Sequence, residues 1–299
     1  MLIIGSHTNF GPKQILGCVK QTINYEANSF MFYTGAPQNS IRKSIDPEIT
    51  KEAHKLMNEH NINPDHVICH AAYIINLANK ETQSKWDFSI DFLIQEVNRC
   101  RSLGVKFIII HPGSYVNHSK EEGIANIIEA LNIVCNSTTD VCILLETMAG
   151  KGTEIGSTFE EIKAIIDGVN TTNQLGVCFD TCHTFDAGYD ISDFNSILDE
   201  FDQKIGLKHL KCLHINDSKN SFQSRKDRHA NLGFGQIGFQ KLIDIIYNPR
   251  IEAVPKILET PWVKDNDNNF PPYKYEIAMI KSKTFQEDLI KTIIKYQGL

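Results

Sequence analysis

Eight short apolar runs, each separated from the next by a longer amphipathic stretch, constrain the fold of this chain most strongly. They are rich in Val, Ile, Leu and Cys and lie at 2–6, 29–33, 66–69, 106–110, 141–145, 176–179, 210–213 and 255–258. Continuous apolar character indicates strands covered on both faces, as in a parallel sheet. The remaining pattern predicts helices near 12–27, 47–60, 85–103, 120–135, 159–168, 193–205, 237–247, 273–282 and 285–297.

This alternation favours a (β/α)8 TIM barrel over an open doubly wound sheet. No glycine-rich G-x-G-x-x-G or Walker-type loop follows any run, so the usual nucleotide-binding reason for an open sheet is missing. No Gly/Ser-rich linker divides the 299 residues, and we expect residues 1–299 to form one barrel domain. Two of the predicted helices begin with capping-box spellings, Ser119-Lys-Glu-Glu122 and Thr158-Phe-Glu-Glu161.

Composition narrows the class of protein. A net charge of −6 argues against a protein that coats nucleic acid by bulk charge. The eight cysteines form no C-x-x-C pair and several lie inside apolar runs, so we expect them to be reduced and buried. The sequence shows no signal peptide and no apolar run of about 18 residues that would span a membrane. We therefore expect a cytoplasmic monomer.

The ends of the apolar runs carry the functional signal. From the third run to the eighth, each ends on a residue type that binds metal ions, in the order His70, His111, Glu146, Asp180, His214 and Glu259. In a barrel these strand ends meet at one mouth, where the active sites of such folds lie. A single histidine after a strand is usually structural, but six such residues in succession favour a metal centre.

Loop segments add three candidate ligands, namely His183, Asp227 and His229. Nine ligands are too many for one zinc ion, which takes four, and they suit two or three ions that share a carboxylate. The four carboxylates give −4 and three zinc ions would give +6, so the cluster would be net +2. Such a centre would attract an anionic substrate.

Longer motifs surround these residues. They are Thr34-Gly-Ala-Pro-Gln38, His70-Ala-Ala-Tyr73, His111-Pro-Gly113, Glu146-Thr-Met-Ala-Gly-Lys-Gly152, Phe179-Asp-Thr-Cys-His183, His214-Ile-Asn-Asp-Ser-Lys219 and Asp227-Arg-His229. On these motifs essentially the whole chain resembles the endonuclease IV family of apurinic/apyrimidinic endonucleases, in its bacterial branch.

The resemblance implies a TIM barrel that holds three zinc ions and divides the nine ligands among them. His70, His111 and Glu146 would bind the first ion, Glu146, Asp180, His214 and Glu259 the second, and His183, Asp227 and His229 the third. The implied activity is hydrolysis of the phosphodiester 5′ to an abasic site in duplex DNA, leaving a 3′-hydroxyl and a 5′-deoxyribose phosphate. Trimming of blocked 3′ ends would use the same cluster. Glu146 and Glu259 are the catalytic candidates, because Glu146 bridges two ions and Glu259 can orient the attacking water.

Contacts with DNA are expected from loops at the same mouth. Tyr73 and Ile74 match the family's wedge positions, which would unstack a base step from the minor groove. Gln38 stands where some members place an inserting Arg, with Arg42 and Lys43 nearby in sequence. We expect contacts to phosphates from the basic residues Lys219, Arg225, Lys226 and Arg228. The structural alternatives are that Tyr73 and Ile74 only cover the top of the barrel, and that the basic residues only form a solvated loop.

Two other functions fit part of the pattern. A sugar isomerase of the xylose-isomerase type also uses a barrel with His and carboxylate ligands. Its usual two-metal, carboxylate-rich site does not account for five histidines or for the pair Asp227 and His229. A metal-dependent DNA-binding or storage module without catalysis is consistent with the composition. It does not explain why the ligands gather where a barrel places catalysis.

Overall fold

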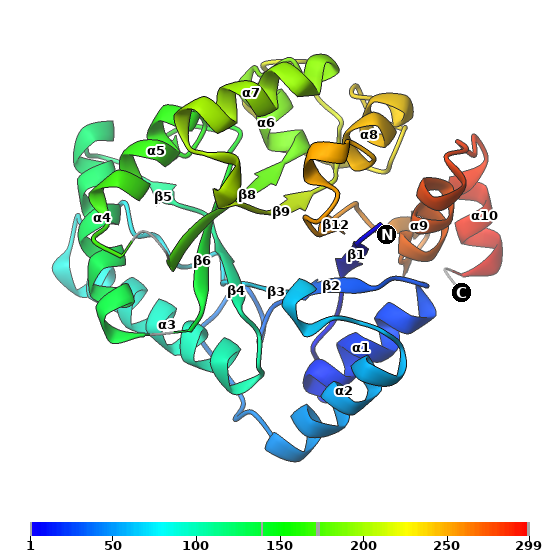
Figure 1. The fold of residues 1–299 in the computed structure, drawn as a ribbon, viewed down its shortest axis with the longest axis horizontal. Helices are drawn as coiled ribbons and strands as arrows, with labels where there is room; N and C mark the ends of the chain where they lie inside the picture. Colours follow the sequence, from blue (N-terminus) through cyan, green and yellow to red (C-terminus); the bar gives the residue numbers. More distant parts are fainter. Residues whose placement is uncertain (1, 139, 172–173, 298–299) are drawn as a thin grey trace.

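Eight parallel strands close into a barrel, and helices surround it (Figure 1). The structure is a computed structural model and describes residues 2–138, 140–171 and 174–297. The barrel strands are β1 (Ile4–His7), β2 (Ser29–Phe32), β3 (Val67–His70), β4 (Phe107–Ile110), β6 (Cys142–Glu146), β8 (Leu175–Asp180), β9 (Leu210–His214) and β12 (Lys256–Leu258). They follow chain order around the ring, and β12 closes it against β1. The predicted TIM barrel is confirmed, with every predicted strand placed to within two residues at each end.

The predicted helices are present on the outside of this barrel. They are α1 (Gln14–Asn24), α2 (Pro47–Glu59), α3 (Gln83–Ser102), α4 (Lys120–Ser137), α5 (Phe159–Gly168), α7 (Phe194–Lys204), α8 (Phe239–Ile246), α9 (Tyr273–Ser282) and α10 (Leu289–Tyr296). Short 3-10 turns lie at Pro64–His66, Ile191–Asp193, Leu207–His209 and Pro249–Ile251. Within the described residues, no helix is long and apolar enough to cross a bilayer.

One further helix, α6 (Thr181–Ala187), follows β8 without a loop, so the expectation that His183 lies in a loop is wrong. The Asp180 side chain caps this helix by accepting a hydrogen bond from the His183 backbone amide at 2.8 Å. Gly188 ends it in the left-handed region, with φ at 110°. The helix has seven residues and is almost wholly buried, so it carries no amphipathic pattern from which to predict it.

The two capping-box predictions have different outcomes. Ser119 and Glu122 exchange both expected hydrogen bonds at the start of α4. Thr158 accepts the expected bond from the Glu161 amide, but the Glu161 carboxylate turns to the amides of Gly156 and Ser157 instead. The second box is therefore only half formed, because the incoming loop offers its own unpaired amides to the carboxylate.

Strand side chains alternate between the barrel interior and the surrounding helices. On β4, Ile108 and Ile110 pack in the large core beneath the helices, whereas Ile109 packs inside the barrel. The interior layer consists of Met31, Ile68, Ile109, Leu144, Cys178, Cys212 and Ile257, all fully buried. Both faces of each strand are therefore covered, which explains why the runs are continuously apolar.

This alternation also positions the polar residues at the strand ends. Side chains on one face of a strand recur every second residue. Six residues of the apolar interior layer are each followed two positions later by a candidate ligand, namely His70, His111, Glu146, Asp180, His214 and Glu259. These six form the next layer upward, at the carboxyl-terminal mouth of the barrel.

Three two-stranded ribbons form in the loops between the barrel elements. They pair β5 (Gly113–Ser114) with β7 (Glu154–Ile155), β10 (Asp217–Ser218) with β11 (His229–Ala230), and β13 (Val263–Asp265) with β14 (Asn268–Phe270). The β10–β11 pair brings the two ends of the basic segment together, so residues 219–228 form a loop that begins and ends at the mouth. All eight cysteines lie in the described part of the chain and are free, and only Cys142 is partly exposed. The expectation of reduced, buried cysteines holds for the other seven.

Candidate metal centre

Glu146 lies at the middle of the polar layer, at the end of β6, and its side chain is 1% exposed. Its Oε2 atom lies 3.1 Å from His70 Nε2 and 3.2 Å from His111 Nε2. Its Oε1 atom lies 2.9 Å from His214 Nδ1. One carboxylate thus faces imidazoles on two sides, and each of its oxygens could serve a different metal ion.

The second group of ligands surrounds the Nδ1 atom of His214. Glu259 Oε2 lies 2.8 Å from it, and Asp180 Oδ2 lies 3.7 Å from it. Together with Glu146, these residues offer ligand atoms that all lie within 4.8 Å of one another. Three carboxylates and one imidazole at such spacing can hold a dication.

The third group lies on the side of α6 and the 219–228 loop. Asp227 Oδ1 lies 3.0 Å from His183 Nε2 and 3.4 Å from His229 Nε2. Asp180 Oδ2 lies 3.8 Å from His229 Nε2, so Asp180 stands between the second and third groups. The structure therefore brings all nine sequence-predicted ligands to one mouth, in three neighbouring groups.

The charges in this cluster fit a cation. Burial disfavours the ionised form of Glu146, but His214 and His111 outweigh it and hold the pKa of this carboxyl well below its usual range. Burial alone would lower the pKa of His183, but Asp180 and Asp227 raise it well above the usual value. Among the described residues, His214 Nε2 and His229 Nε2 are buried without a hydrogen-bond partner. Buried carboxylates are stabilised by a nearby positive charge. The two imidazole nitrogens have lone pairs or protons that no protein group uses, so the set of donor atoms fits metal ions.

Backbone carbonyls orient three of the imidazoles. The Nδ1 atoms of His70, His183 and His229 lie 2.8, 2.9 and 3.3 Å from the carbonyl oxygens of Ala71, Thr147 and Glu259, respectively. A ring that donates its Nδ1 proton to a carbonyl presents the lone pair of Nε2 to the centre. The rings are thus held in the tautomer that a metal ligand needs.

Asn216, which the sequence pattern did not single out, holds two of the carboxylate ligands in place. Its Nδ2 donates to Asp180 Oδ2 at 2.7 Å, and its Oδ1 accepts from the Glu259 backbone amide at 3.0 Å. Asn216 follows His214 by two residues. Residues two apart lie on the same face of an extended chain, so this spacing was the available signal.

A second missed residue, Asp186, anchors the 219–228 loop to α6. Its buried carboxylate accepts from Ser218 Oγ at 2.7 Å, from Asn220 Nδ2 at 2.8 Å and from the Asp227 backbone amide at 3.0 Å. Asp186 lies one helical turn after His183, and that spacing was the available signal.

Glu276 on α9 links the segments that follow two ligands, His229 and Glu259. Its carboxylate accepts from the Leu232 amide at 3.0 Å, from Asn231 Nδ2 at 3.1 Å and from the Thr260 hydroxyl. Burial outweighs these hydrogen bonds and raises the pKa of Glu276 to about 7. Nothing in the sequence near α9 marks this role, because the contacts are to distant segments.

The predicted wedge lies at the rim of the mouth. The Tyr73 side chain is exposed, and the centroid of its ring lies 5.8 Å from the centroid of the His111 ring. Its hydroxyl accepts a hydrogen bond from the Tyr33 hydroxyl. The Tyr73 amide donates to the Pro37 carbonyl at 3.1 Å, so the Gln38 segment lies beside the wedge. Gln38 is exposed and Ile74 is half-buried. The basic candidates Lys219, Arg225, Lys226 and Arg228 are all exposed.

Arg42 lies near Gln38 in sequence, but its guanidinium is buried in its own loop. Its guanidinium Nε lies 2.8 Å from Glu96, and both side chains are at most 2% exposed. Its Nη1 donates to the carbonyl oxygens of Ala36, Asn39 and Ile41. Arg42 therefore shapes its own loop from inside, while Lys43 remains exposed.

Comparison with known proteins agrees with this geometry. Residues 19–283 match the protein family described as the xylose isomerase-like TIM barrel. A protein named "Probable endonuclease 4" from Geobacillus kaustophilus is 49% identical over 296 residues, covering 98% of each chain. The structure of endonuclease IV from Thermus thermophilus superposes with a TM-score of 0.78 at 27% identity, covering 93% of this chain and 97% of that one.

Sugar epimerases share the fold alone. A D-tagatose 3-epimerase-like protein superposes with a TM-score of 0.68, but only 15% of the aligned residues are identical over 99% of each chain. The near-complete coverage at 49% identity decides between the two groups. The chain belongs to the endonuclease 4 family of apurinic/apyrimidinic endonucleases, within the xylose isomerase-like TIM barrels.

Proposed function

We propose that this protein is a zinc-dependent DNA-repair endonuclease that hydrolyses the phosphodiester 5′ to abasic sites in duplex DNA. The products would be a 3′-hydroxyl and a 5′-deoxyribose phosphate, and the same residues would trim blocked 3′ ends. One observation carries the proposal, namely the convergence of nine His, Asp and Glu side chains on one barrel mouth around Glu146. Membership of the endonuclease 4 family supports it.

The ligand groups assign roles to the protein side chains. His70, His111 and Glu146 would hold the first zinc, Glu146, Asp180, His214 and Glu259 the second, and His183, Asp227 and His229 the third. Bound zinc lowers the pKa of a coordinated water from about 15.7 to about 7 and neutralises charge on a phosphate. Glu146 fixes the spacing of the first two groups, because each of its oxygens faces a different group.

Glu259 is the residue that we assign to proton transfer. Its side chain is 16% exposed, compared with 1% for Glu146, so it can meet water at the mouth. His214 outweighs the effect of burial and holds the pKa of Glu259 well below its usual range, so its carboxylate is ionised and can accept a hydrogen bond from water. Its backbone amide is fixed by Asn216 at 3.0 Å. Glu259 would orient the attacking water and take its proton.

The surface around the mouth supports binding of a distorted duplex. A cavity of about 770 Å³ is lined by Tyr33, Gln38, Tyr73 and Trp262, beside the metal centre. We infer that Tyr73 and Ile74 enter the minor groove and that this cavity receives the extrahelical abasic nucleotide. A missing base lowers the cost of unstacking, which itself gives selectivity.

The basic residues of the 219–228 loop are assigned to the DNA backbone. Lys219, Lys226 and Arg228 are exposed on the loop that begins and ends at the mouth, and Gln38 borders the cavity. Contacts from such residues to phosphates position the duplex without reading its sequence. A locally basic loop, together with bound dications, would attract DNA although the chain is acidic overall.

The direct test uses duplex DNA that carries one tetrahydrofuran analogue of an abasic site. This analogue cannot undergo β-elimination, so a nick must come from hydrolysis. We expect a nick on its 5′ side with a 3′-hydroxyl end, loss of cleavage with a chelator, and recovery when zinc is restored. If the zinc-loaded protein binds this duplex and leaves it intact, the proposal is wrong.

A further inference from the structure

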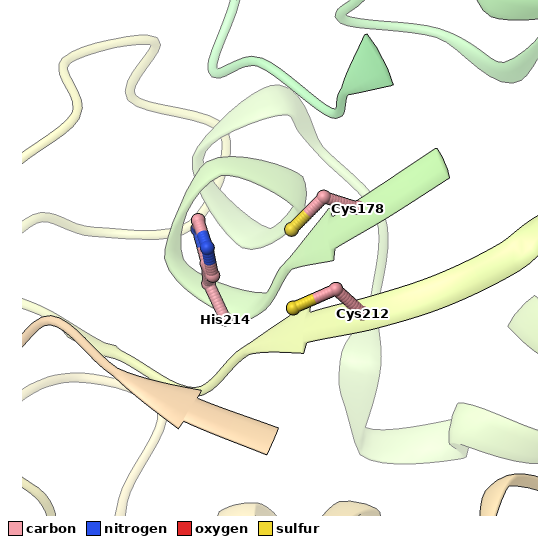
Figure 2. Close-up of side chains that lie close together, drawn as sticks. All are labelled: Cys178, Cys212 and His214. Atoms are coloured by element: carbon pink, nitrogen blue, oxygen red, sulfur yellow. The ribbon is translucent and has the colours of Figure 1, made fainter. Parts of the chain in front are cut away.

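Directly below the polar layer lies a second set of ligand atoms, on Cys178, Cys212 and His214. Both cysteines belong to the interior layer and are fully buried. Figure 2 shows their sulfur atoms on neighbouring strands, both on the side that faces the His214 ring. The ligand atoms of the three residues all lie within 4.8 Å of one another. The set is therefore a compact group of two sulfur donors and one nitrogen donor.

An irregularity in the sheet creates this grouping. Strands β8 and β9 pair in register at Val177 and Leu210, but an extra residue enters β9 before the next pair. As a result Cys178 lies opposite Cys212, and Asp180 lies opposite His214. A bulge of this kind re-aims side chains. Here it places two thiols side by side, one layer beneath two candidate zinc ligands.

We propose that Cys178, Cys212 and His214 form a separate site for a thiophilic divalent cation, sharing His214 with the carboxylate centre above. Thiolate and imidazole donors suit soft or borderline ions, whereas the centre above is rich in carboxylate oxygen. Binding of the cation would release the two thiol protons to solvent, and two thiolates with one dication sum to zero charge, which suits the surrounding apolar layer. That layer includes Met31, Ile109 and Leu144.

His214 has the capacity to serve both sites. Its Nδ1 atom faces the carboxylates of Glu146 and Glu259 at 2.9 and 2.8 Å. Its Nε2 atom is buried and has no hydrogen-bond partner among the described residues. An imidazole can bind a metal through either nitrogen. A neutral ring has one lone pair, so binding a cation through each nitrogen at once requires loss of the ring proton to solvent.

Sharing has a consequence for the upper centre. A cation held by the two thiols would compete for His214 or draw its ring downward, and zinc in the second ligand group would be held less tightly. This consequence rests on the proposed zinc centre, whereas binding at the thiols does not. The cysteine pair would therefore make the enzyme sensitive to thiophilic metals.

Cadmium is the probe for the site, because thiolate-to-cadmium charge transfer absorbs in the ultraviolet. The full-length zinc-loaded protein, kept reduced with a phosphine, is titrated with cadmium chloride in the absence of DNA. We expect the absorption band to saturate at about one cadmium per chain and to disappear in Cys178→Ala/Cys212→Ala. The matched control is Cys69→Ala/Cys100→Ala, a second pair of buried neighbouring cysteines, which should keep the band. A band that survives the first substitution, or that only the control removes, overturns the proposal.

Two further measurements keep the test decisive. X-ray absorption at the cadmium edge on the unsubstituted protein does not depend on how a variant folds. We expect two sulfur neighbours, and a shell of only nitrogen and oxygen refutes the site. Zinc released by cadmium should be several-fold greater from the unsubstituted protein than from Cys178→Ala/Cys212→Ala, and equal release contradicts the sharing of His214. Failure to nick the tetrahydrofuran duplex would instead count against the proposed nuclease function, since none of these readouts uses DNA.

Discussion

The metal centre has an inner half at the strand ends and an outer half on α6 and the 219–228 loop, which differ in what holds them. Most of their residues also differ in burial, although His111 of the inner half is 31% exposed and His183 of the outer half is 3% exposed. At the strand ends, the side chains of Glu146, Asp180 and His214 are at most 1% exposed. On the loop side, those of Asp227 and His229 are 32% and 20% exposed. The inner residues are held by the alternation of the barrel strands, and the outer ones by a loop that needs anchors of its own.

The outer half contains residues in energetically unfavourable backbone conformations. Gln223, Arg225 and Asp227 all adopt positive φ values, of 63°, 55° and 52°. Such conformations cost on the order of 1 kcal/mol each in residues with a side chain, and they persist only when surrounding contacts impose them. Asp186 supplies contacts of this kind, including one to the Asp227 amide. We infer that the inner half tolerates changes in the loops, whereas the outer half depends on a few hydrogen bonds.

Substitution of Glu146 should have the largest effect, because it joins two ligand groups of the inner half. Glu146→Gln removes the negative charge that the imidazoles of His70, His111 and His214 face, with little change in side-chain volume. We expect cleavage of abasic DNA to fall by more than the roughly 100-fold that loss of a residue supporting a metal ligand costs. Zinc content should fall as well. Glu129→Gln, at an exposed ion pair with Lys80, is the matched control and should leave both unchanged.

Glu259→Gln should separate catalysis from binding. It keeps the shape of the side chain but removes the proton acceptor, so we expect turnover to fall by roughly 10²–10⁴-fold. Zinc content and the affinity for abasic DNA should change little. Single-turnover cleavage together with a binding titration measures both. A fully metallated variant that cleaves at nearly the original rate would contradict the role of Glu259.

The pH dependence of stability should reveal Glu276, which ties the segment after His229 in the outer half to the segment after Glu259 in the inner half. Burial raises the pKa of this carboxyl from 4.5 to about 7. The folded state therefore binds the proton more tightly, and this stabilisation is complete below pH 4.5 and is lost as the pH rises through about 7. As the pH rises between these limits, the free energy of unfolding of Glu276→Gln should increase by up to about 3 kcal/mol relative to that of the unsubstituted protein. Denaturant unfolding across the pH range measures the difference, and a pH-independent difference would contradict the assignment.

Asp186→Ala should weaken only the outer half. Without its carboxylate, the Asp227 amide and Ser218 lose their anchor, so we expect roughly 10–100-fold weaker binding of the outermost zinc, with the inner ions retained. Competition with a graded series of chelators measures this. Asp190→Ala, which alters an exposed turn shortly after α6, is the control. Uniform loss of every ion would show that the two halves are not separable.

Lys226→Ala should have the smallest effect, because it touches neither half of the centre. One phosphate contact fewer should weaken DNA binding uniformly across sequences and reduce the slope of log affinity against log salt by about 1. Lys51→Ala, on the exposed side of α2, serves as the comparison. An unchanged slope would remove Lys226 from the interface.

The same division describes what the sequence could predict. His70, Glu146, Asp180 and His214 each end a continuous apolar run, so the barrel and its strand-end layer could be predicted from the sequence. The anchor Glu276 was not predictable, because its partners lie tens of residues away and its own surroundings look ordinary. Asp186 offered only its spacing of one helical turn from His183, and its partners are equally distant in sequence.

Two features could not be read from the sequence, for physical reasons. Helix α6 is too short and too buried to show a period, which hid the helical position of His183. The position of Arg42 depends on a buried carboxylate 54 residues away, which the local sequence does not reveal. Positive charge in a loop predicts exposure only when no buried partner is within reach.

The number of zinc ions per chain tests the divided centre most directly. Elemental analysis of the unsubstituted protein should give about three zinc ions, and Asp227→Ala/His229→Ala should give about two, because only the outer group is removed. Two ions in the unsubstituted protein, as expected for the two-metal site of a sugar isomerase, would contradict the account. So would an undiminished count in the substituted protein.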